Sequence, residues 1–281
     1  MDTANSLTAA STAISVSALR SMLGTPSAPC IVDVRRAAAF AADPFVLPAA
    51  MQGPPDELCA WADALPADRP IVVYCVHGHE VGRQAAAGLR VLGREASYLE
   101  GGIEAWKGAG APVMRKRPEI GLPGSKSSQW VTRERPKIDR IACPWLIRRF
   151  IDPRADFLYV PAGEVLDTAR RLHALPYDVP DVQFSHVGDH CSFDAVLKLF
   201  EIDEPALNQL ALIVRGADTG KPELTPQSPG LLAISLGLSA IYPDDLEMLE
   251  HGMHVYDALY AWLRAAQGEI HNADLFRKAA S

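Results

Sequence analysis

Short apolar runs alternate with helical patterns in the first part of the chain. The run from Ile71 to Tyr74 is rich in β-branched and aromatic side chains, which is typical of a buried parallel strand, and residues 84–92 have the composition of a helix. Further strands are expected at residues 30–34 and 96–99, and further helices at residues 15–23, 56–64 and 102–106. This alternation predicts an α/β domain, a mostly parallel sheet flanked by helices.

The pattern changes after residue 108. Residues 108–129 are rich in Gly, Pro, Ser, Lys and Arg and have no hydrophobic period, which is typical of a linker. Helical patterns dominate beyond it, so we expect a mainly helical α+β domain there. The sequence is therefore divided into a first domain (1–114), a linker (115–129) and a second domain (130–281).

The turn after residue 74 carries a single cysteine, Cys75. A strand that turns sharply into a helix presents backbone N–H groups and the positive end of the helix dipole to that turn, and both favour an anion. A thiolate is such an anion, so we expect Cys75 to be a reactive nucleophile. Cys59, by contrast, is expected to pack with Trp61 near the apolar face of its helix.

The segment Cys75-Val-His-Gly-His-Glu-Val81 resembles the active-site loop of rhodanese-type sulfurtransferases. Ile31-Val-Asp-Val-Arg35 and Leu99-Glu-Gly-Gly-Ile-Glu-Ala-Trp106 match in order and spacing. The resemblance implies a persulfide on Cys75, a small-molecule sulfur donor and a thiol acceptor. It also implies that substrate is bound by the loop and by a nearby aspartate: His77, Gly78, His79, Glu80, Val81, Gly82, Arg83 and Asp33.

One loop position departs from the resemblance. Many active rhodaneses have Arg or Lys late in the loop, whereas this chain has Glu80. A carboxylate there should discourage thiosulfate, although Arg83, His77 and His79 could supply positive charge. The alternative interpretation is that Cys75 is a retired nucleophile in a module kept for binding.

Composition and charge narrow the function classes. The net charge of −7, from 27 basic and 34 acidic residues, argues against a general nucleic-acid binder. Five cysteines, an odd number without a Cys-x-x-Cys pair, favour a reducing compartment. Residues 1–22 lack the pattern of a secretory signal, and no window is apolar enough to span a membrane, so we expect a cytoplasmic protein.

Residues 130–153 contain six basic and three acidic residues in a chain that is acidic overall. This local excess indicates an anion site, with Arg140 and Arg148 as candidates, or an ion-pair network. Cys143 precedes Pro144, and proline suits the first position of a helix, so Cys143 is a candidate N-cap of a helix that runs to Phe150. The alternative is a small buried filler.

Residues 184–193 hold several metal-ligand residue types. His186 and Cys191 lie close together around Gly188, and Asp218 follows a helix or strand end further on. These three residues form a candidate transition-metal site, although the spacing matches no standard zinc motif. The alternative is a helix cap with Ser192 as the capping residue. His254 and Asp257 lie about one helical turn apart, and we expect His254 to be a surface residue.

The second half resembles the C-terminal domain of the ChrB-type chromate-resistance proteins. The match is carried by residues 139–152, by His186 with Cys191-Ser-Phe193, by Arg215-Gly-Ala-Asp218 and by residues 256–260. The resemblance implies a role in the response to chromate or a related oxyanion, as sensor, regulator or accessory. Because the leading domain is rhodanese-like, direct DNA binding is not expected.

Overall fold

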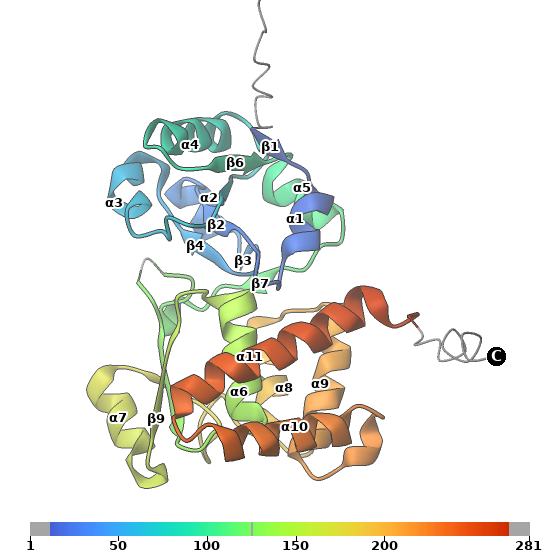
Figure 1. Cartoon of the computed structure of the whole chain (residues 1–281). Coiled ribbons are helices and arrows are strands. Elements are labelled where there is room, and N and C mark those ends of the chain that lie inside the picture. Colours follow the sequence, from blue (N-terminus) through green and yellow to red (C-terminus); the bar gives the residue numbers. More distant parts are fainter. Residues whose placement is uncertain (1–11, 125, 270–281) are drawn as a thin grey trace, which may run out of the picture.

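The computed structural model describes residues 12–124 and 126–269. Figure 1 shows the α/β first domain above the mainly helical second domain. The elements of the first domain are β1 (Ala13–Ile14), α1 (Val16–Met22), β2 (Cys30–Asp33), α2 (Ala37–Ala42), β3 (Phe45–Val46), β4 (Ala50–Gln52), η1 (Pro55–Glu57), α3 (Leu58–Ala62), β5 (Ile71–Tyr74), α4 (Glu80–Val91), β6 (Ala96–Leu99), α5 (Gly102–Gly108) and β7 (Met114–Arg115).

The sheet of the first domain is parallel, with the strand order β1-β6-β5-β2-β4. Successive side chains of its strands point to opposite faces. Val32 and Val73 belong to the core against α3 and α4, whereas Val72 and Tyr74 belong to the core against α1 and α5. The predicted α/β fold is confirmed, and its central strand β5 ends directly before Cys75.

The second domain packs helices around a small parallel sheet, β10-β8-β9. Its elements are β8 (Gln129–Arg133), α6 (Asp139–Leu146), the π-helical turn η3 (Ile147–Ile151), β9 (Asp156–Val160), η4 (Ala162–Glu164), α7 (Val165–Leu172), β10 (Leu175–Pro176), α8 (Ser192–Phe200), α9 (Pro205–Asp218), η5 (Pro222–Leu224), α10 (Ser228–Ile241), α11 (Asp245–Ala261) and the π-helical turn η6 (Trp262–Ala266). The predicted mainly helical α+β class is confirmed.

Helix α6 begins five residues before the predicted position. Pro144 lies inside it, and Cys143 is fully buried mid-helix, so the prediction that Cys143 caps a helix beginning at Pro144 is wrong. Proline has no N–H to donate to the carbonyl of Arg140, four residues earlier. The Tyr159 hydroxyl donates to that carbonyl instead (2.9 Å). A tertiary contact thus keeps the helix continuous, and Cys143 is the buried filler of the alternative interpretation.

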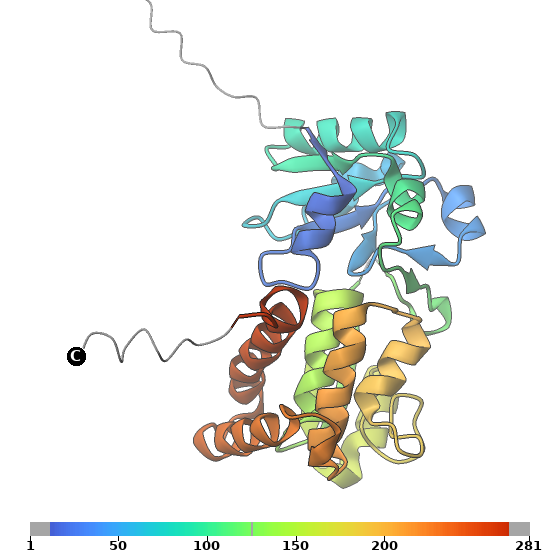
Figure 2. The same cartoon turned by 90° about the vertical axis from the view of Figure 1, so that its right-hand side faces the viewer.

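The two domains share a contact surface that Figure 2 shows from the side. Arg264, at the end of the last helix, donates to the carbonyls of Arg20, Ser21 and Leu23 at 3.0–3.1 Å. The amide of Ala49 donates to the carbonyl of Phe150 (2.6 Å). These contacts join α1 and the loop before β4 to the second domain.

The segment that we predict as a linker also packs against the second domain. It contains η2 (Pro118–Ile120), and Leu122 within it is buried in the main hydrophobic core. Arg117 donates to the carbonyl of Leu199 in α8, with 2.8 Å between Nε and the oxygen. The boundaries at 114 and 130 stay predictions.

Two smaller expectations have different outcomes: the one for Cys59 is wrong and the one for His254 is confirmed. Cys59 is exposed, because α3 turns only Trp61 and Ala62 into the core. His254 is exposed as expected, with its Nδ1 3.9 Å from Asp257. Among the helices in the described ranges, none is long and apolar enough to cross a membrane.

Candidate functional site

Cys75 lies at the carboxyl end of β5, and the turn Cys75–His79 leads into α4. The helical hydrogen bonds of α4 begin at Arg83, whose N–H donates to the carbonyl of His79 (3.1 Å). The amides of the preceding turn therefore have no partner within α4. This turn lies next to the sulfur, because a Cβ at Gly82 would be 3.3 Å from Cys75 Sγ. This is an arrangement suited to an anionic sulfur.

Backbone contacts from α5 fix the loop. Ile103 N–H donates to the carbonyl of Cys75 (3.0 Å), and Glu104 N–H donates to that of Val76 (3.1 Å). Gly102 makes this approach feasible: its φ is +59°, and a Cβ there would lie 2.3 Å from the Cys75 oxygen. Gly78 (φ +65°) packs equally closely against Leu99 and Gly101. The loop conformation thus depends on two glycines that no other residue can replace without displacement.

The side chains of the loop form its outer rim. Cys75 is only 6% exposed, whereas His77, His79, Glu80 and Arg83 are exposed. The guanidinium of Arg83 lies over the ring of Tyr98 (5.4 Å), and Glu80 accepts a hydrogen bond from Gln84 (2.9 Å). The sulfur therefore lies below a rim that carries both signs of charge.

Two further loop residues shape the space at the sulfur. Val81 is half-buried and packs against the core next to Cys75. Gly82 faces the sulfur directly, since a Cβ at Gly82 would lie 3.3 Å from Cys75 Sγ.

Asp33 is fully buried next to the strand that carries the loop. Its carboxylate accepts from Arg35 Nη2 (2.6 Å) and from the Tyr74 hydroxyl (2.7 Å). Tyr74 directly precedes Cys75, so Asp33 supports the end of β5. These hydrogen bonds use both oxygens of the Asp33 carboxylate. Asp33 therefore supports the loop and does not contact the substrate directly in the mechanism that we propose below.

A second cluster lies in the helical domain, around the imidazole of His186. Its Nε2 is 3.2 Å from Asp218 Oδ2, 3.3 Å from Asp178 Oδ1 and 3.4 Å from Asp139 Oδ2. Asp139 begins α6, Asp218 ends α9, and the other two residues lie in the loop between β10 and α8. Three distant parts of the chain thus meet at one nitrogen.

The charges of this cluster perturb one another. Burial raises the pKa of Asp139, and burial together with the charge of Asp139 raises the pKa of Asp218 to about 7. A hydrogen bond with Asp139 raises the pKa of His186 to about 9. Arg140 and Arg133 approach only Asp178, at 3.3 and 3.0 Å. Asp139 and Asp218 have no arginine or lysine partner among the described residues.

The predicted metal site is only partly assembled. His186 and Asp218 lie together with Asp139, and their ligand atoms lie within 4.8 Å of one another. Cys191 does not belong to this group; it is the N-cap residue of α8, where its N–H donates to Asp194 (3.0 Å). Burial raises the pKa of the Cys191 thiol. Cys191, not Ser192, therefore occupies the cap position.

Sequence reasoning missed Asp139 and Asp178. Asp139 opens the segment that carries the resemblance of the second domain, and this was the available signal. Asp178 lies in a loop without any pattern. Ser192 links the two, because its N–H donates to Asp139 (2.5 Å) and its hydroxyl donates to Asp178 (2.9 Å).

The basic residues of the segment 130–153 mostly form ion pairs. Arg140 pairs with Asp178, and Arg148 pairs with Glu250 (2.6 Å). Arg149 pairs with Asp257 (2.8 Å). Of the two interpretations of this basic segment, the ion-pair network is the one that the contacts support. Arg148 also lines a cavity of about 610 Å³ between the domains, with Arg69, Arg149, Arg154 and Cys30.

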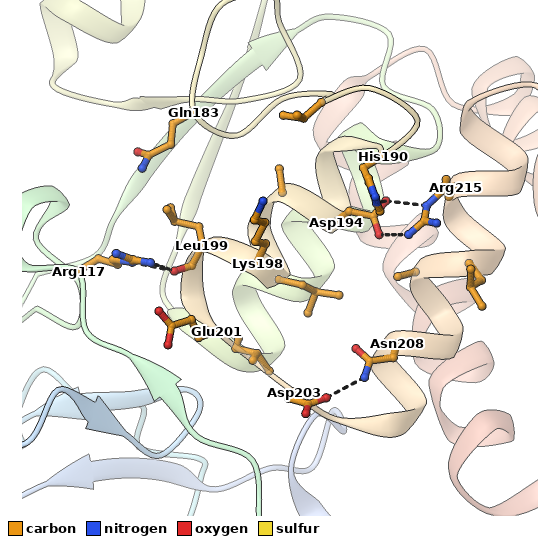
Figure 3. Close-up of a pocket in the computed structure, with 16 residues that line it drawn as sticks. Arg117, Gln183, His190, Asp194, Lys198, Leu199, Glu201, Asp203, Asn208 and Arg215 are labelled. Carbon is orange, nitrogen blue, oxygen red and sulfur yellow. Dashed lines mark hydrogen bonds and ion pairs between the residues drawn. The ribbon is translucent and has the colours of Figure 1, made fainter.

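Another cavity, of about 900 Å³, lies beside α8 and α9 (Figure 3). Asp194 pairs there with Arg215 (2.6 Å), and Asn208 donates to Asp203 (2.8 Å). None of the predicted site residues lines this cavity.

Known proteins resemble the two halves separately. Residues 15–109 match the family described as Rhodanese-like domain, and residues 130–263 match the ChrB C-terminal domain. Protein ChrB of Cupriavidus metallidurans is 37% identical over 135 residues, which cover 47% of this chain and 40% of that protein. The chain thus matches well under two thirds of that relative.

Solved structures match the first domain. A rhodanese-related protein from Thermoplasma volcanium is 27% identical, with 36% of this chain and 95% of that chain covered and a TM-score of 0.32. A rhodanese-like domain protein from Staphylococcus aureus is 23% identical, with 34% and 89% covered and a TM-score of 0.31. The family matches thus divide the chain into a part similar to the Rhodanese-like domain, residues 15–109, and a part similar to the ChrB C-terminal domain, residues 130–263.

Proposed function

We propose that this protein acts in the response to chromate and that its first domain is a sulfurtransferase with a persulfide on Cys75. The observation that carries the second part is the loop geometry: the Cys75 sulfur lies beside the first turn of α4, below an exposed rim. The first part comes from the resemblance of the second domain to the ChrB C-terminal domain.

The reaction requires two transfers of one sulfur atom. The Cys75 thiolate attacks the outer sulfur of the donor, and a new S–S bond forms as the donor's bond to that sulfur breaks. The donor leaves as sulfite from thiosulfate or, after protonation, as pyruvate from 3-mercaptopyruvate. An acceptor thiolate or cyanide then attacks the outer sulfur and regenerates the Cys75 thiolate.

The residues of the loop have distinct parts in this reaction. The amides of the first turn of α4 stabilise the negative charge on the persulfide. Arg83, His77 and His79 attract an anionic donor at the rim, whereas Glu80 repels a dianion. We therefore expect 3-mercaptopyruvate, which carries a single carboxylate, to be a better donor than thiosulfate.

The test measures thiocyanate formed from either donor and cyanide. Wild type is expected to form it well above the rate without protein, and Cys75→Ser only at that background. Cys59→Ser is the matched control, because Cys59 is an exposed cysteine of the same domain and should leave the rate unchanged. Equal background rates for wild type and Cys75→Ser would show that the domain is not catalytic.

The alternative is a chromate-binding protein or regulator with a non-catalytic rhodanese module. The cavity between the domains is the candidate place for the anion, because its lining has four arginines against three carboxylates, those of Asp68, Asp156 and Glu250. Cys30 marks the starting end of β2, so this cavity and the Cys75 loop lie at opposite ends of the sheet. Chromate retention in equilibrium dialysis should therefore be the same for wild type and Cys75→Ser. Retention without any sulfur transfer would favour the alternative.

A further inference from the structure

The position of His186 Nε2 has no satisfactory explanation by hydrogen bonds alone. Three carboxylate oxygens lie 3.2–3.4 Å from this one nitrogen. A ring nitrogen carries at most one hydrogen, so it can donate to only one of these oxygens. Ser192 donates to two of them, Asp139 Oδ2 and Asp178 Oδ1. A cation beside Nε2 would be shared by this nitrogen and by the carboxylates of Asp139 and Asp218.

Asp139 supplies an independent observation. Its side chain is 1% exposed, and its Oδ1 has no hydrogen-bond partner among the described residues. Buried carboxylate oxygens are almost always bonded, because a buried polar atom without a partner is costly. The other oxygen, Oδ2, accepts from Ser192 N–H (2.5 Å), so the carboxylate is held firmly while one oxygen stays free for a ligand.

Arginine side chains approach only one of the three carboxylates. Arg133 and Arg140 both pair with Asp178, and Ser192 also donates to it. Asp139 and Asp218 form their ion pairs in the described ranges only with His186. Asp178 is therefore a positioning residue for His186, whereas Asp139 and Asp218 have no arginine or lysine partner among the described residues.

The spacing fits a metal ion. Two ligands that hold Zn²⁺ at roughly 2.0–2.1 Å, at the tetrahedral angle, lie roughly 3.3–3.4 Å apart. The distance from His186 Nε2 is 3.4 Å to Asp139 Oδ2, the oxygen that Ser192 N–H holds in place, and 3.2 Å to Asp218 Oδ2. The geometry points to a divalent first-row transition-metal ion, such as Zn²⁺ or Mn²⁺, bound by Asp139, His186 and Asp218.

The ligand set and the exposure define the site further. An imidazole nitrogen with two carboxylates suits Zn²⁺ or Mn²⁺ better than Ca²⁺, which takes oxygen ligands. His186 and Asp218 are 40% and 19% exposed, so solvent reaches the site and can complete the coordination. This site does not depend on Cys75, and it goes beyond the proposed sulfur transfer.

The test uses the full-length chain, purified without a histidine tag, treated with a chelator and titrated with Zn²⁺ and Mn²⁺ by calorimetry. Wild type is expected to bind about one equivalent of at least one of the two ions. Asp139→Asn and Asp218→Asn are each expected to weaken binding at least tenfold. His186→Gln gives a half-exposed second variant that should fold even if Asp139→Asn does not.

Two controls separate this site from its neighbours. Asp189→Asn removes a carboxylate of the same loop that pairs with Lys221, and it should leave the affinity unchanged. Cys191→Ser should also leave it unchanged, because Cys191 lies outside the ligand group. Less than about a tenth of an equivalent of either ion in wild type would overturn the proposal. Equal affinity for wild type, Asp218→Asn and His186→Gln would also overturn it.

Discussion

Each domain buries an aspartate completely, but the two aspartates have different surroundings. Asp33 accepts hydrogen bonds from Arg35 and from the Tyr74 hydroxyl on its two oxygens. Asp139 has one oxygen without a partner among the described residues, and its nearest charged neighbours are His186 and two further carboxylates. Asp33 is paired with an arginine, whereas among the described residues Asp139 has only the His186 imidazole as an ion-pair partner.

This difference separates a structural residue from a candidate ligand. A buried charge that is fully bonded holds the backbone in place and leaves nothing for a substrate. A buried carboxylate with a free oxygen next to other carboxylates is costly unless a cation joins it. By this criterion Asp33 supports the Cys75 loop from below, whereas Asp139 is a ligand of the metal site that we propose.

The largest effect is expected when Asp33 loses its partner. Arg35→Met keeps an unbranched apolar stem but leaves the buried carboxylate without its cation. We expect the free energy of unfolding to fall by about 3–5 kcal/mol, as is usual when one partner of a buried pair is removed. Urea unfolding followed by circular dichroism measures it.

The control for this variant is an exposed ion pair. Asp167 and Arg170 are about three-quarters exposed, so Arg170→Met should change the stability by less than about 0.5 kcal/mol. Similar losses for the two variants would mean that Asp33 is less dependent on Arg35 than the bonds suggest.

The second prediction concerns the backbone around Cys75. In Gly102→Ala the new Cβ would lie 2.3 Å from the Cys75 oxygen, so the loop must move. We expect the thiocyanate rate to fall about a hundredfold, because small displacements of reacting groups have effects of that size. Gly110→Ala is the matched control: its φ is +62°, but nothing lies within 4 Å of the new Cβ. If both variants lost activity equally, backbone strain and not the contact would be responsible.

The smallest effect is expected at Asp194, a carboxylate of the second domain that does have its cation. Burial raises the pKa of Asp194, but hydrogen bonds from Arg215 and from Cys191 N–H outweigh it, so the pKa lies below the usual range. The ionised form therefore stabilises the fold above the unfolded pKa of about 3.9, and this contribution is lost as the pH falls through the lower folded pKa. Asp194→Asn should cost about 1–2 kcal/mol at pH 7.

The pH dependence distinguishes this effect from a loss of packing. The difference in unfolding free energy between wild type and Asp194→Asn should shrink as the pH is lowered from 7 to about 3. Asp203→Asn, which removes an exposed carboxylate of the same cavity, should show little difference at any pH. A difference of constant size would contradict the assignment of the effect to charge.

The local pattern of the sequence predicted the first site well. The strand, the cysteine turn and the helix are contiguous, so the apolar run before Cys75 and the helical run after it were enough to place the sulfur at a helix start. Gly102 lies outside this segment. Its close contact with the Cys75 carbonyl depends on the packing of α5 against the loop, and no local pattern indicated it.

The second site could be predicted only in part. His186 and Asp218 were chosen by residue type, but Cys191 was chosen for its nearness in sequence and lies at a helix cap instead. Asp139 joined the site only through the fold, because the start of α6 packs beside the end of α9. The same holds for Pro144, whose place inside a helix depends on a hydroxyl from β9.

The sequence by itself determined the α/β and helical halves and the cysteine turn, because these depend on contacts between residues close along the chain. The tertiary structure alone decided which charges are neutralised. Arg35 neutralises Asp33, and Arg133 and Arg140 neutralise Asp178, whereas Asp139 and Asp218 face one imidazole. Charge pairing between distant segments depends on how whole helices and loops pack, so it cannot be predicted from local sequence patterns.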